Sequence, residues 1–339
     1  MSISLIRPGL LTTVQDLGRP GYRAAGVPLG GALDAPALRL ANLLVGNAPG
    51  EASLEITLAG PTLRFEAPHL LALVGADLSA TLDGKPLPLG RPVAVQAGTV
   101  LAFGAARAGC RAYLALAGGL GLPPVLGSCS TLVRAALGGL HGRALLAGDV
   151  LPAPGPGGPG AALRARLALA FQGSSHAAAP WHPAPAERPA LAAAPVLRAL
   201  PGPEYAEFAP ESQRAFWQQP FTVTPAADRM GYRLAGPPLA RLAGAELLSS
   251  AVAPGTVQVP PGGQPIVLLA DCQTTGGYPR LAHVIAPDLG LLAQARPGTP
   301  LRFQQLSQAE AHALYLAQEA QLRTLAANYS AFLTQWLRQ

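Results

Sequence analysis

Lysine is almost missing from this chain of 339 residues, because Lys85 is its only one and the formal net charge of +6 comes almost wholly from arginine. A phosphate-binding loop of the Walker type requires Gly-Lys-Ser/Thr, whereas Lys85 lies in D-G-K-P, a turn sequence. A biotinyl or Schiff-base lysine would have to be this same residue, and the turn context indicates a solvated side chain. The chain therefore carries neither a P-loop nor a biotin of its own.

Cysteine is also scarce. Cys110, Cys129 and Cys272 are odd in number and form no C-x-x-C motif, so they indicate neither a disulfide framework nor a zinc site. No apolar run approaches the roughly 20 residues that span a bilayer. The first residues, M-S-I-S-L-I-R-P-G, lack the basic region and long apolar run of a signal peptide. We expect a cytoplasmic protein without a membrane segment.

Charged and aromatic residues are few, at 12% and 5% of the chain. A groove for nucleic acid needs a basic stripe with aromatic side chains between the charges, and the arginines here are scattered. The positive balance instead favours weak attraction of small anionic substrates.

Glycine and proline are abundant, with 39 and 36 residues, and half of the chain is apolar. This composition favours many short strands and turns over long helices. Short apolar runs such as L-E-I-T-L, L-L-A-L-V, P-V-A-V-Q and P-I-V-L-L-A, each bounded by Gly or Pro, indicate β-barrels or sandwiches. The length exceeds that of one ordinary core, so two domains are expected.

A Pro/Gly/Ala-rich break divides the chain. We predict a first β-barrel domain at 1–151, a linker at 152–195, a second barrel at 196–306 and a C-terminal helix at 307–339. Within the linker, L-R-A-R-L-A-L-A-F (163–171) is compatible with one more strand of the first domain.

Two helices stand out. One begins at Asp34, a good N-cap, and ends at Gly46, a good C-cap. The other occupies the C-terminus, where Ser307 and Glu310 form a capping box. It carries an apolar stripe at three- and four-residue spacing: Leu322, Leu325, Tyr329, Phe332 and Trp336. This stripe either packs on its own domain or binds a partner.

The two halves echo each other. G-Y-R occurs at 21–23 and 231–233, L-A-G-P at 58–61 and 234–237, and G-T-V-L-A-F at 98–103 resembles G-T-P-L-R-F at 298–303. Together these echoes favour two related barrels over two unrelated domains.

Four polar segments interrupt the apolar pattern, and each combines glycine with side chains that fix a small polar molecule. They are T-T-V-Q-D-L-G-R-P-G-Y at 12–22, G-S-C-S-T at 127–131, D-R-M-G-Y-R at 228–233 and D-C-Q-T-T-G-G-Y-P-R at 271–280. The alternative is that the same residue types build tight turns. We expect segments from both halves to meet around one cleft, with Gln15 and Thr275 on its walls.

No nucleophile–base pair is evident in these segments. The histidines at 69, 141, 283 and 312 lie outside them. Cys129 and Cys272 lie inside, but we interpret them as small buried or half-buried thiols, since a thiolate needs a basic neighbour. G-S-C-S-T also fails the G-x-S-x-G nucleophile elbow, because its fifth residue is Thr131.

The polar segments and their flanks resemble the biotin-dependent carboxyltransferase family, which includes the C subunits of 5-oxoprolinases and allophanate hydrolase subunit 2-like proteins. The resemblance rests on R-P-G-L-L-T-T-V-Q-D-L-G-R-P-G-Y-R, L-A-N-L-L-V-G-N, D-R-M-G-Y-R-L and V-P-P-G-G-Q-P-I-V-L-L-A-D-C-Q-T-T-G-G-Y-P, and covers roughly residues 3–305. The chain departs from the family pattern at Gly30, Ser250 and Cys272, where serine, a polar or acidic residue and a basic residue are common.

The resemblance implies a mainly β fold of two related cyclophilin-like barrels with a few short helices. It implies work with KipI-like and LamB/YcsF-like partner subunits, which together with this chain open the lactam of 5-oxoproline to glutamate with ATP. ATP then belongs to the complex, and this chain is expected to be inactive alone.

A lactam is a resonance-stabilised amide, so attack on it requires stabilisation of the developing oxyanion, and an arginine can clamp the substrate carboxylate. Arg19 or Arg229 is the expected clamp. The predicted catalytic residues are Asp16, Asp228, Asp271 and Arg229. The predicted substrate-binding residues are Gln15, Arg19, Tyr22, Ser128, Ser130, Thr131, Tyr232, Gln273, Thr274, Thr275, Gly276, Gly277 and Tyr278, and no metal site is expected.

Two other functions stay open. One is biotin-dependent carboxyl transfer to urea or a related amide, with biotin on a separate carrier chain. The other is a regulatory role, in which the chain sequesters a KipI-like inhibitor and the C-terminal helix matters more than the cleft.

Overall fold

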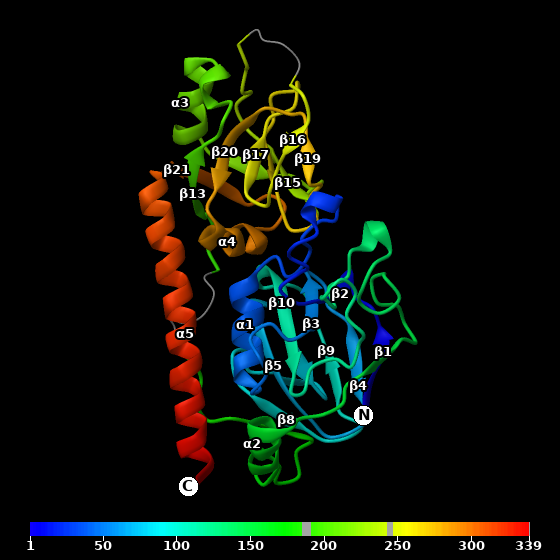
Figure 1. Cartoon of the computed structure of the whole chain (residues 1–339). Coiled ribbons are helices and arrows are strands. Elements are labelled where there is room, and N and C mark those ends of the chain that lie inside the picture. Colours follow the sequence, from blue (N-terminus) through cyan, green and yellow to red (C-terminus); the bar gives the residue numbers. More distant parts are fainter. Residues whose placement is uncertain (185–190, 243–246, 339) are drawn as a thin grey trace. The chain divides into compact units, whose positions relative to one another are not determined.

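The computed structural model describes residues 1–184, 191–242 and 247–338, so residues 185–190 of the predicted linker lie outside the described part. Its described residues divide into two compact units (Figure 1). Unit 1 contains residues 1–18, 34–184, 191 and 322–338, and unit 2 contains 19–33, 192–242 and 247–321. Residues 19–33, which the sequence prediction placed in the first domain, therefore group with the second half of the chain.

Unit 1 contains two antiparallel six-stranded sheets, and the predicted barrel of the first domain stays a prediction. The first sheet has the order β11-β1-β4-β9-β6-β7 and the second β12-β8-β5-β10-β3-β2. The strands are β1 (Ser2–Arg7), β2 (Leu11–Gln15), β3 (Ser53–Thr57), β4 (Thr62–Phe65), β5 (His69–Asp77), β6 (Thr81–Leu82), β7 (Lys85–Pro86), β8 (Val93–Val95), β9 (Val100–Ala102), β10 (Ala108–Leu116), β11 (Val150–Pro152) and β12 (His176–Ala178).

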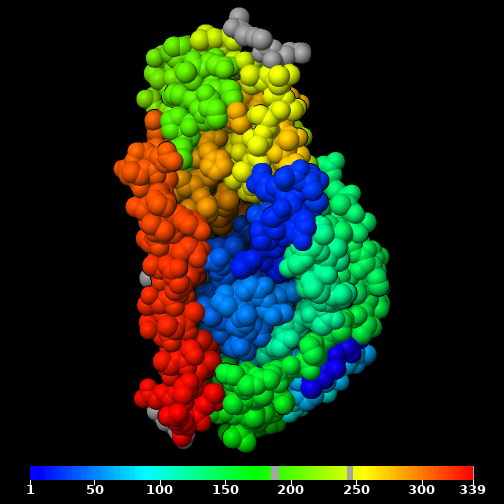
Figure 2. Space-filling view, viewed as in Figure 1, coloured from blue at the N-terminus to red at the C-terminus, as the bar shows by residue number. Residues whose placement is uncertain are grey.

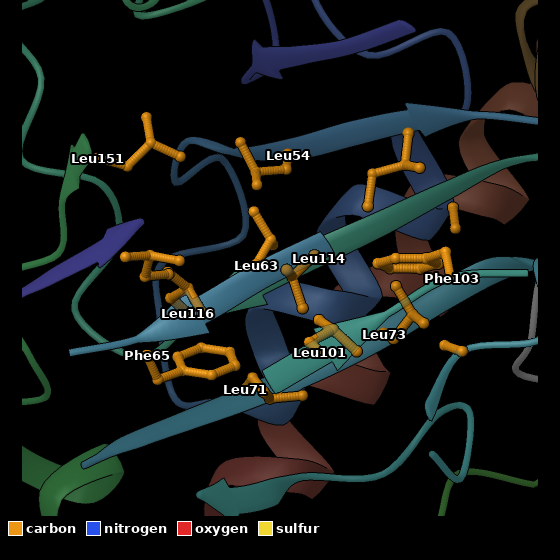
Figure 3. Close-up of a cluster of buried hydrophobic side chains, with 14 of the residues drawn as sticks. Leu54, Leu63, Phe65, Leu71, Leu73, Leu101, Phe103, Leu114, Leu116 and Leu151 are labelled. Atoms are coloured by element: carbon orange, nitrogen blue, oxygen red, sulfur yellow. The ribbon is translucent and has the colours of Figure 1, made fainter. Parts of the chain in front are cut away.

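The core of unit 1 is built by side chains that both sheets contribute (Figure 3). Leu63, Phe65 and Leu101 come from the first sheet, and Leu54 and Leu114 come from the second. Each of these five side chains is fully buried. Because alternate residues of a strand point to the same face, the short apolar runs of the sequence supply this core directly.

Helix α1 (Ala35–Leu44) packs on β5 and β10 of the second sheet. Its predicted ends are confirmed. The Asp34 carboxylate accepts a hydrogen bond from the Ala37 amide at 3.1 Å, as an N-cap does. Gly46 has φ +79°, a left-handed conformation that glycine adopts without strain, and it follows directly on the C-cap Val45.

Residues 163–171 do not form the predicted strand. Helix α2 (Gly158–Ala168) covers most of the segment, with Pro159 in its first turn. Leu163 and Leu167 are buried on one face, and their four-residue spacing is that of a helix. The extra strand of this region is β12, which follows α2 and pairs with β8.

Unit 2 contains a closed barrel with the strand order β13-β20-β17-β18-β15-β14-β21. Its pairs are antiparallel except for β13 with β21, which is parallel. The strands are β13 (Val196–Pro201), β14 (Phe221–Val223), β15 (Gly231–Ala235), β17 (Thr256–Gln258), β18 (Ile266–Leu268), β20 (Arg280–Val284) and β21 (Pro300–Gln305). The prediction of a mainly β chain with a barrel and few helices is confirmed.

Short elements complete unit 2. A two-stranded sheet joins β16 (Ser250–Ala251) to β19 (Thr275–Gly276). The helices are α3 (Pro210–Gln218), α4 (Leu289–Gln294) and the 3₁₀ turns η1 (Arg23–Ala25), η4 (Tyr205–Glu207) and η5 (Ala286–Asp288); unit 1 has a further 3₁₀ turn, η2 (Val133–Ala135). Phe216 of α3 stacks on Phe303 of β21, with ring centroids 4.3 Å apart, and so fastens α3 to the barrel.

The repeated sequence motifs of the two halves are only partly equivalent in structure. In both copies of L-A-G-P the glycine follows a strand and lies against a phenylalanine, where a Cβ on Gly60 or Gly236 would come within 2.5 Å or 2.4 Å of the ring. The two copies of G-Y-R are not equivalent, because 21–23 lies in a loop and turn while 231–233 lies in β15. The predicted common origin of the two halves stays a prediction.

The C-terminal helix α5 (Gln308–Arg338) begins with the predicted capping box. The Ser307 amide donates to the Glu310 carboxylate at 2.8 Å, and the Glu310 amide donates to the Ser307 hydroxyl at 3.3 Å. Figure 2 shows exposed atoms of this helix, coloured orange to red. Among the described residues, no helix is long and apolar enough to cross a membrane.

The apolar stripe of α5 packs on the chain's own residues. Trp181 meets Tyr329, Phe332 and Trp336 edge-on, with ring centroids 5.1–6.0 Å apart. The Tyr329 hydroxyl donates to the Leu44 carbonyl at the end of α1, at 2.8 Å. The interpretation in which the stripe packs on its own domain is therefore the correct one for this part of the helix.

Candidate functional site

The first polar loop of unit 1 is organised by Asp16, which lies at the end of β2. Its Oδ1 accepts hydrogen bonds from the Gly18 amide at 2.7 Å and from the Ser128 and Ser130 hydroxyls at 2.6 Å and 2.5 Å. Its Oδ2 accepts from the Cys129 amide at 2.6 Å. Three of these four donors bind Oδ1 and one binds Oδ2, so both carboxylate oxygens are engaged by the chain's own groups. In this structure Asp16 holds 127–131 against β2, and its catalytic role stays a prediction.

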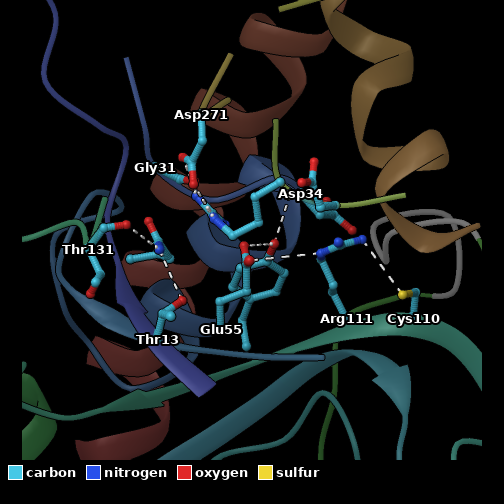
Figure 4. A network of polar contacts seen from close by, with 12 residues as sticks. Thr13, Gly31, Asp34, Glu55, Cys110, Arg111, Thr131 and Asp271 are labelled. Carbon is cyan, nitrogen blue, oxygen red and sulfur yellow. Dashed lines mark hydrogen bonds and ion pairs between the residues drawn. The ribbon is translucent and has the colours of Figure 1, made fainter. Parts of the chain in front are cut away.

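Two buried polar atoms next to this loop are unsatisfied. The Gln15 amide group donates to the Thr13 hydroxyl at 3.0 Å and to the Thr131 carbonyl at 3.1 Å (Figure 4). Gln15 Oε1 and Thr131 Oγ1 have no hydrogen-bond partner among the residues that the structure describes. A buried polar atom without a partner costs about 1–3 kcal/mol. A ligand or water that donates to Gln15 Oε1 would recover this energy.

Unit 1 also contains a buried network that the sequence analysis missed. The Tyr113 hydroxyl donates to Glu55 Oε2 at 2.7 Å and accepts from the Asp34 amide at 2.8 Å (Figure 4). Arg111 Nε lies 3.8 Å from Glu55 Oε1. Burial raises the pKa of Tyr113 well above its ordinary value, so its hydroxyl stays protonated and able to donate. The signal in the sequence was a charged or polar residue at alternate positions of two apolar strands.

Two predicted catalytic residues of unit 2 form a buried ion pair. Arg229 Nε and one of its terminal nitrogens donate to the two carboxylate oxygens of Asp271 at 2.8 Å and 2.9 Å, and both side chains are only 6% exposed (Figure 4). The same terminal nitrogen donates to the Gly31 carbonyl at 2.7 Å. Arg229 is thus already engaged by a carboxylate of the protein, and its role as a substrate clamp stays a prediction.

The excursion of residues 19–33 is bound to the second half of the chain. Besides the bond from Arg229 to Gly31, the Gly30 amide donates to the Ala270 carbonyl at 3.0 Å, and the Arg23 guanidinium donates to the Val252 carbonyl. Arg19 of the same segment is fully buried, whereas Tyr22 is 38% exposed. Unit 2 is therefore complete only with residues from the first part of the chain.

Asp228 and Tyr232 each have a structural role in unit 2. Asp228 is exposed and accepts from the amides of Met230 at 2.8 Å and Gly231 at 3.1 Å, which closes the turn before β15. Tyr232 is 2% exposed and lies in the barrel core, where its hydroxyl donates to the Ala295 carbonyl at 3.2 Å. The strand alternation turns this side chain inward, and the role of Tyr232 in substrate binding stays a prediction.

The loop 271–278 has its polar side chains outside the barrel core. Gln273, Thr275 and Tyr278 are exposed, whereas Thr274 and Gly276 are half-buried. These side chains are accessible to a ligand, and their role in substrate binding stays a prediction. The loop contains neither histidine nor serine, the residue types of a common nucleophilic site.

Gly277 and Tyr278 line a cavity of about 610 Å³ that lies within unit 2. Leu239, Val259 and Pro260 form its apolar wall, and Arg241 is its charged member. The guanidinium of Arg241 donates to the Glu207 carboxylate at 2.5 Å and 2.8 Å, so the charge at this wall is balanced. The cavity is of the size that binds small organic molecules.

Cys272, beside Asp271, is not an activated thiol. It is 3% exposed, and burial raises its pKa to about 11. Cys129 is half-buried, and its thiol donates to the Leu122 carbonyl at 3.4 Å. The interpretation of both residues as small structural thiols agrees with these positions. The described residues contain no cluster of His, Cys, Asp or Glu able to hold a metal ion.

The structure thus brings together Gln15, Asp16, Ser128, Ser130 and Thr131 in unit 1. In unit 2 it brings Asp271 and Arg229 to the segment that carries Arg19 and Tyr22. Gln15 belongs to unit 1 and Thr275 to unit 2. Their meeting around one cleft stays a prediction.

Comparison with known proteins assigns the chain to a family. Residues 25–305 match the family described as carboxyltransferase domain, subdomain A and B, and the chain belongs to this family. It is 45% identical to the C subunit of Escherichia coli 5-oxoprolinase over 309 residues, which cover 91% of this chain and 93% of that protein. It is 42% identical to the C subunit of Haemophilus influenzae 5-oxoprolinase, over 88% of this chain and 89% of that one.

Among solved structures, the chain is similar to the Kluyveromyces lactis urea carboxylase. The TM-score is 0.84 at 29% identity, and the match covers 95% of this chain but only 29% of the urea carboxylase. The family therefore includes both free-standing chains of this length and modules of much longer proteins.

Proposed function

We propose that this chain is the C subunit of an ATP-dependent 5-oxoprolinase, which opens the lactam of 5-oxoproline to glutamate. The observation that carries the proposal is end-to-end similarity: the match covers 93% of the E. coli 5-oxoprolinase C subunit at 45% identity. The chain is then a component of an enzyme complex and is inactive alone.

The chemistry of the loops supports this proposal. A lactam presents one N–H donor, one carbonyl oxygen and, in 5-oxoproline, a carboxylate. Gln15 Oε1 is a buried acceptor without a partner in the described part of the chain, and Thr131 Oγ1 beside it is a hydroxyl in the same condition. The hydroxyls, amide and glycines of 273–278 can stabilise the oxyanion that forms when the amide is attacked.

The partners in this proposal are two other subunits, one KipI-like and one LamB/YcsF-like. ATP binds at the level of the complex, since the chain has no Gly-Lys-Ser/Thr loop and its single lysine is the first residue of the short strand β7. ATP would supply phosphorylation of the amide oxygen. The residues of this chain would bind and orient the ring.

The test is to purify the chain with the products of its neighbouring genes and to measure ATP-dependent glutamate release from 5-oxoproline. We expect release only when all subunits and ATP are present. Release without this chain, or no release from the complete complex, would contradict the proposal.

A second candidate function is biotin-dependent carboxyl transfer to urea or a related amide. The observation in its favour is the TM-score of 0.84 to urea carboxylase over 95% of the chain. Biotin would then be carried by a separate chain. Carboxylation of urea by the chain together with a biotinylated carrier, in the absence of 5-oxoprolinase activity, would favour this function.

A further inference from the structure

A second hollow lies on unit 2, with a volume of about 360 Å³. It is bounded by β15, by the start of β18 and by the turn P-P-G-G-Q-P at 260–265. Two motifs that carry the family resemblance therefore meet here: D-R-M-G-Y-R ends at Arg233, and V-P-P-G-G-Q-P provides Gly262 and Gln264. The candidate site around the 271–278 loop uses none of these three residues.

The charge of this hollow is positive. Arg233 is exposed on β15, and no hydrogen bond or ion pair joins its guanidinium to another residue in the described part of the chain. None of the described residues that line the hollow is acidic. A single uncompensated guanidinium beside apolar surface favours an anion with an organic body.

A buried hydroxyl lies beside this charge. The Thr224 amide donates to the Arg233 carbonyl at 3.0 Å, so the two residues are neighbours across the end of the barrel. Thr224 also lines the hollow, and its Oγ1 is buried without a partner among the described residues. A hydroxyl in this condition gains a hydrogen bond when a ligand oxygen arrives.

The wall of the hollow is held in place before any ligand binds. The Gln264 side chain donates to the Gly236 carbonyl at 3.1 Å and accepts from the Gly236 amide at 2.9 Å. The Gly263 amide donates to the Pro260 carbonyl at 2.9 Å and closes the turn. A preformed wall reduces the ordering cost of binding.

We propose that this hollow binds a small organic carboxylate, with the Arg233 guanidinium paired to the carboxylate and the Thr224 hydroxyl as a second donor. Ile266 and Pro260 contact the organic body of the ligand. The volume is at the lower end of the range for small-molecule sites, which suits a compact ligand. This proposal concerns a hollow separate from the 271–278 loop, and only the choice of glutamate and 5-oxoproline as probes rests on the proposed function.

Carboxylate is favoured over phosphate by the backbone of the turn. Phosphate sites in proteins commonly use several main-chain N–H groups. Three of the six residues at 260–265 are prolines, which have no N–H, and the Gly263 N–H is already bonded within the turn. One guanidinium and one hydroxyl match the two oxygens of a carboxylate.

The experiment is titration of the full-length chain with glutamate, 5-oxoproline or inorganic phosphate, at low salt because an exposed charge is screened. The variants are Arg233→Gln, which removes the charge, and Thr224→Val, which removes only the hydroxyl. Arg214→Gln is the matched control, because Arg214 is an exposed arginine of α3 outside the hollow. Thermal unfolding of each variant checks that it folds.

We expect glutamate or 5-oxoproline to bind at millimolar concentration. Arg233→Gln should weaken binding roughly tenfold or more, and Thr224→Val roughly threefold, as expected for a charged and a neutral hydrogen bond. Arg214→Gln should bind as the wild type does. No binding of either carboxylate, binding of phosphate alone, or equal loss in Arg233→Gln and Arg214→Gln would each overturn the proposal. A complex that binds here yet releases no glutamate from 5-oxoproline would contradict only the proposed function.

Discussion

Arg229 and Asp271 lie 42 residues apart in the chain and meet in a bidentate, buried ion pair that also reaches the Gly31 carbonyl. Three segments thus depend on one guanidinium: the turn before β15, the loop after β18 and the excursion of residues 19–33. Because the pair lies at the first residue of the 271–278 loop, it fixes the base of the segment that lines the cavity of unit 2.

Breaking this pair from either side should be costly. In Asp271→Ala or Arg229→Ala one buried charge loses its partner, and we expect a loss of about 3–5 kcal/mol in the free energy of unfolding. The double variant Arg229→Ala/Asp271→Ala should lose less than the sum of the two single changes. Denaturant unfolding measured as a double-mutant cycle checks this, and simple additivity would mean that the pair is not coupled.

The same variants test the site assignment in the reconstituted complex. If the pair positions the loop that binds substrate, Arg229→Ala and Asp271→Ala should reduce glutamate release, and Arg214→Ala should not. Full activity of both single variants would remove the assignment of these residues to the site.

Asp16→Asn should loosen the loop at 127–131. The substitution replaces a carboxylate oxygen with an NH₂ group that faces donors, so hydrogen bonds from Ser128, Ser130 or the Cys129 amide are lost. We expect destabilisation of about 1–3 kcal/mol and faster hydrogen exchange at the Cys129 amide. Asp83→Asn is the control, because Asp83 also accepts a bond from a backbone amide but lies in an exposed hairpin turn of the same unit. Unchanged exchange at Cys129 would show that the carboxylate does not hold the loop.

Stability should fall on acidification because of His69. Burial lowers the pKa of His69 to about 4, from an ordinary value of 6.5, and neither ring nitrogen has a partner among the described residues. The unfolded chain therefore binds a proton at His69 between about pH 6.5 and 4 that the folded chain rejects. The contribution of His69 to the free energy of unfolding is therefore fully present above pH 6.5, the unfolded-state pKa. It is lost as the pH falls toward about 4, the folded-state pKa, and the loss reaches about 3 kcal/mol.

His69→Leu should remove this part of the pH dependence. The measurement is the free energy of unfolding of wild type and variant across this pH range, and their difference isolates His69 from His283, whose pKa is also lowered by burial. Parallel curves for the two proteins would contradict the prediction.

The aromatic contacts of Trp181 should anchor the end of α5. Trp181→Ala removes its packing against Tyr329, Phe332 and Trp336, and we expect a loss of about 2–4 kcal/mol in stability. Tyr315→Ala, at an exposed position of the same helix, should change stability by less than about 0.5 kcal/mol. Thermal unfolding compares the two. Equal losses of stability in Trp181→Ala and Tyr315→Ala would mean that the aromatic cluster around Trp181 adds nothing measurable to the stability of the fold.

Local signals in the sequence predicted local structure. The Asp34 cap and the Ser307–Glu310 box were recognisable because both partners lie within four residues of each other. Residues 163–171 were misassigned because L-R-A-R-L satisfies a period of two as well as the four-residue spacing of Leu163 and Leu167. Only the packing of α2 decides between them.

The sequence indicated which loops are polar, but it did not indicate what each side chain in those loops does. Glycines and hydroxyls marked 127–131 and 271–278 as polar segments, and their place in a substrate site stays a prediction. Whether an aspartate there is a catalyst or a loop organiser depends on donors more than a hundred residues away, as for Asp16 and Ser128. The inward turn of Tyr232 depends on strand register, which the motif D-R-M-G-Y-R does not reveal.

The membership of residues 19–33 in unit 2 has a consequence for how the protein is made. During synthesis these residues leave the ribosome long before Arg229, Val252 and Ala270, to which they are bonded in the folded chain. Unit 2 therefore cannot reach its final state while the nascent chain is still short. Residues 19–33 form their hydrogen bonds to unit 2 only after some two hundred further residues have been synthesised. Folding of unit 2 therefore requires both halves of the chain, because residues 19–33 come from the first half and the barrel strands come from the second.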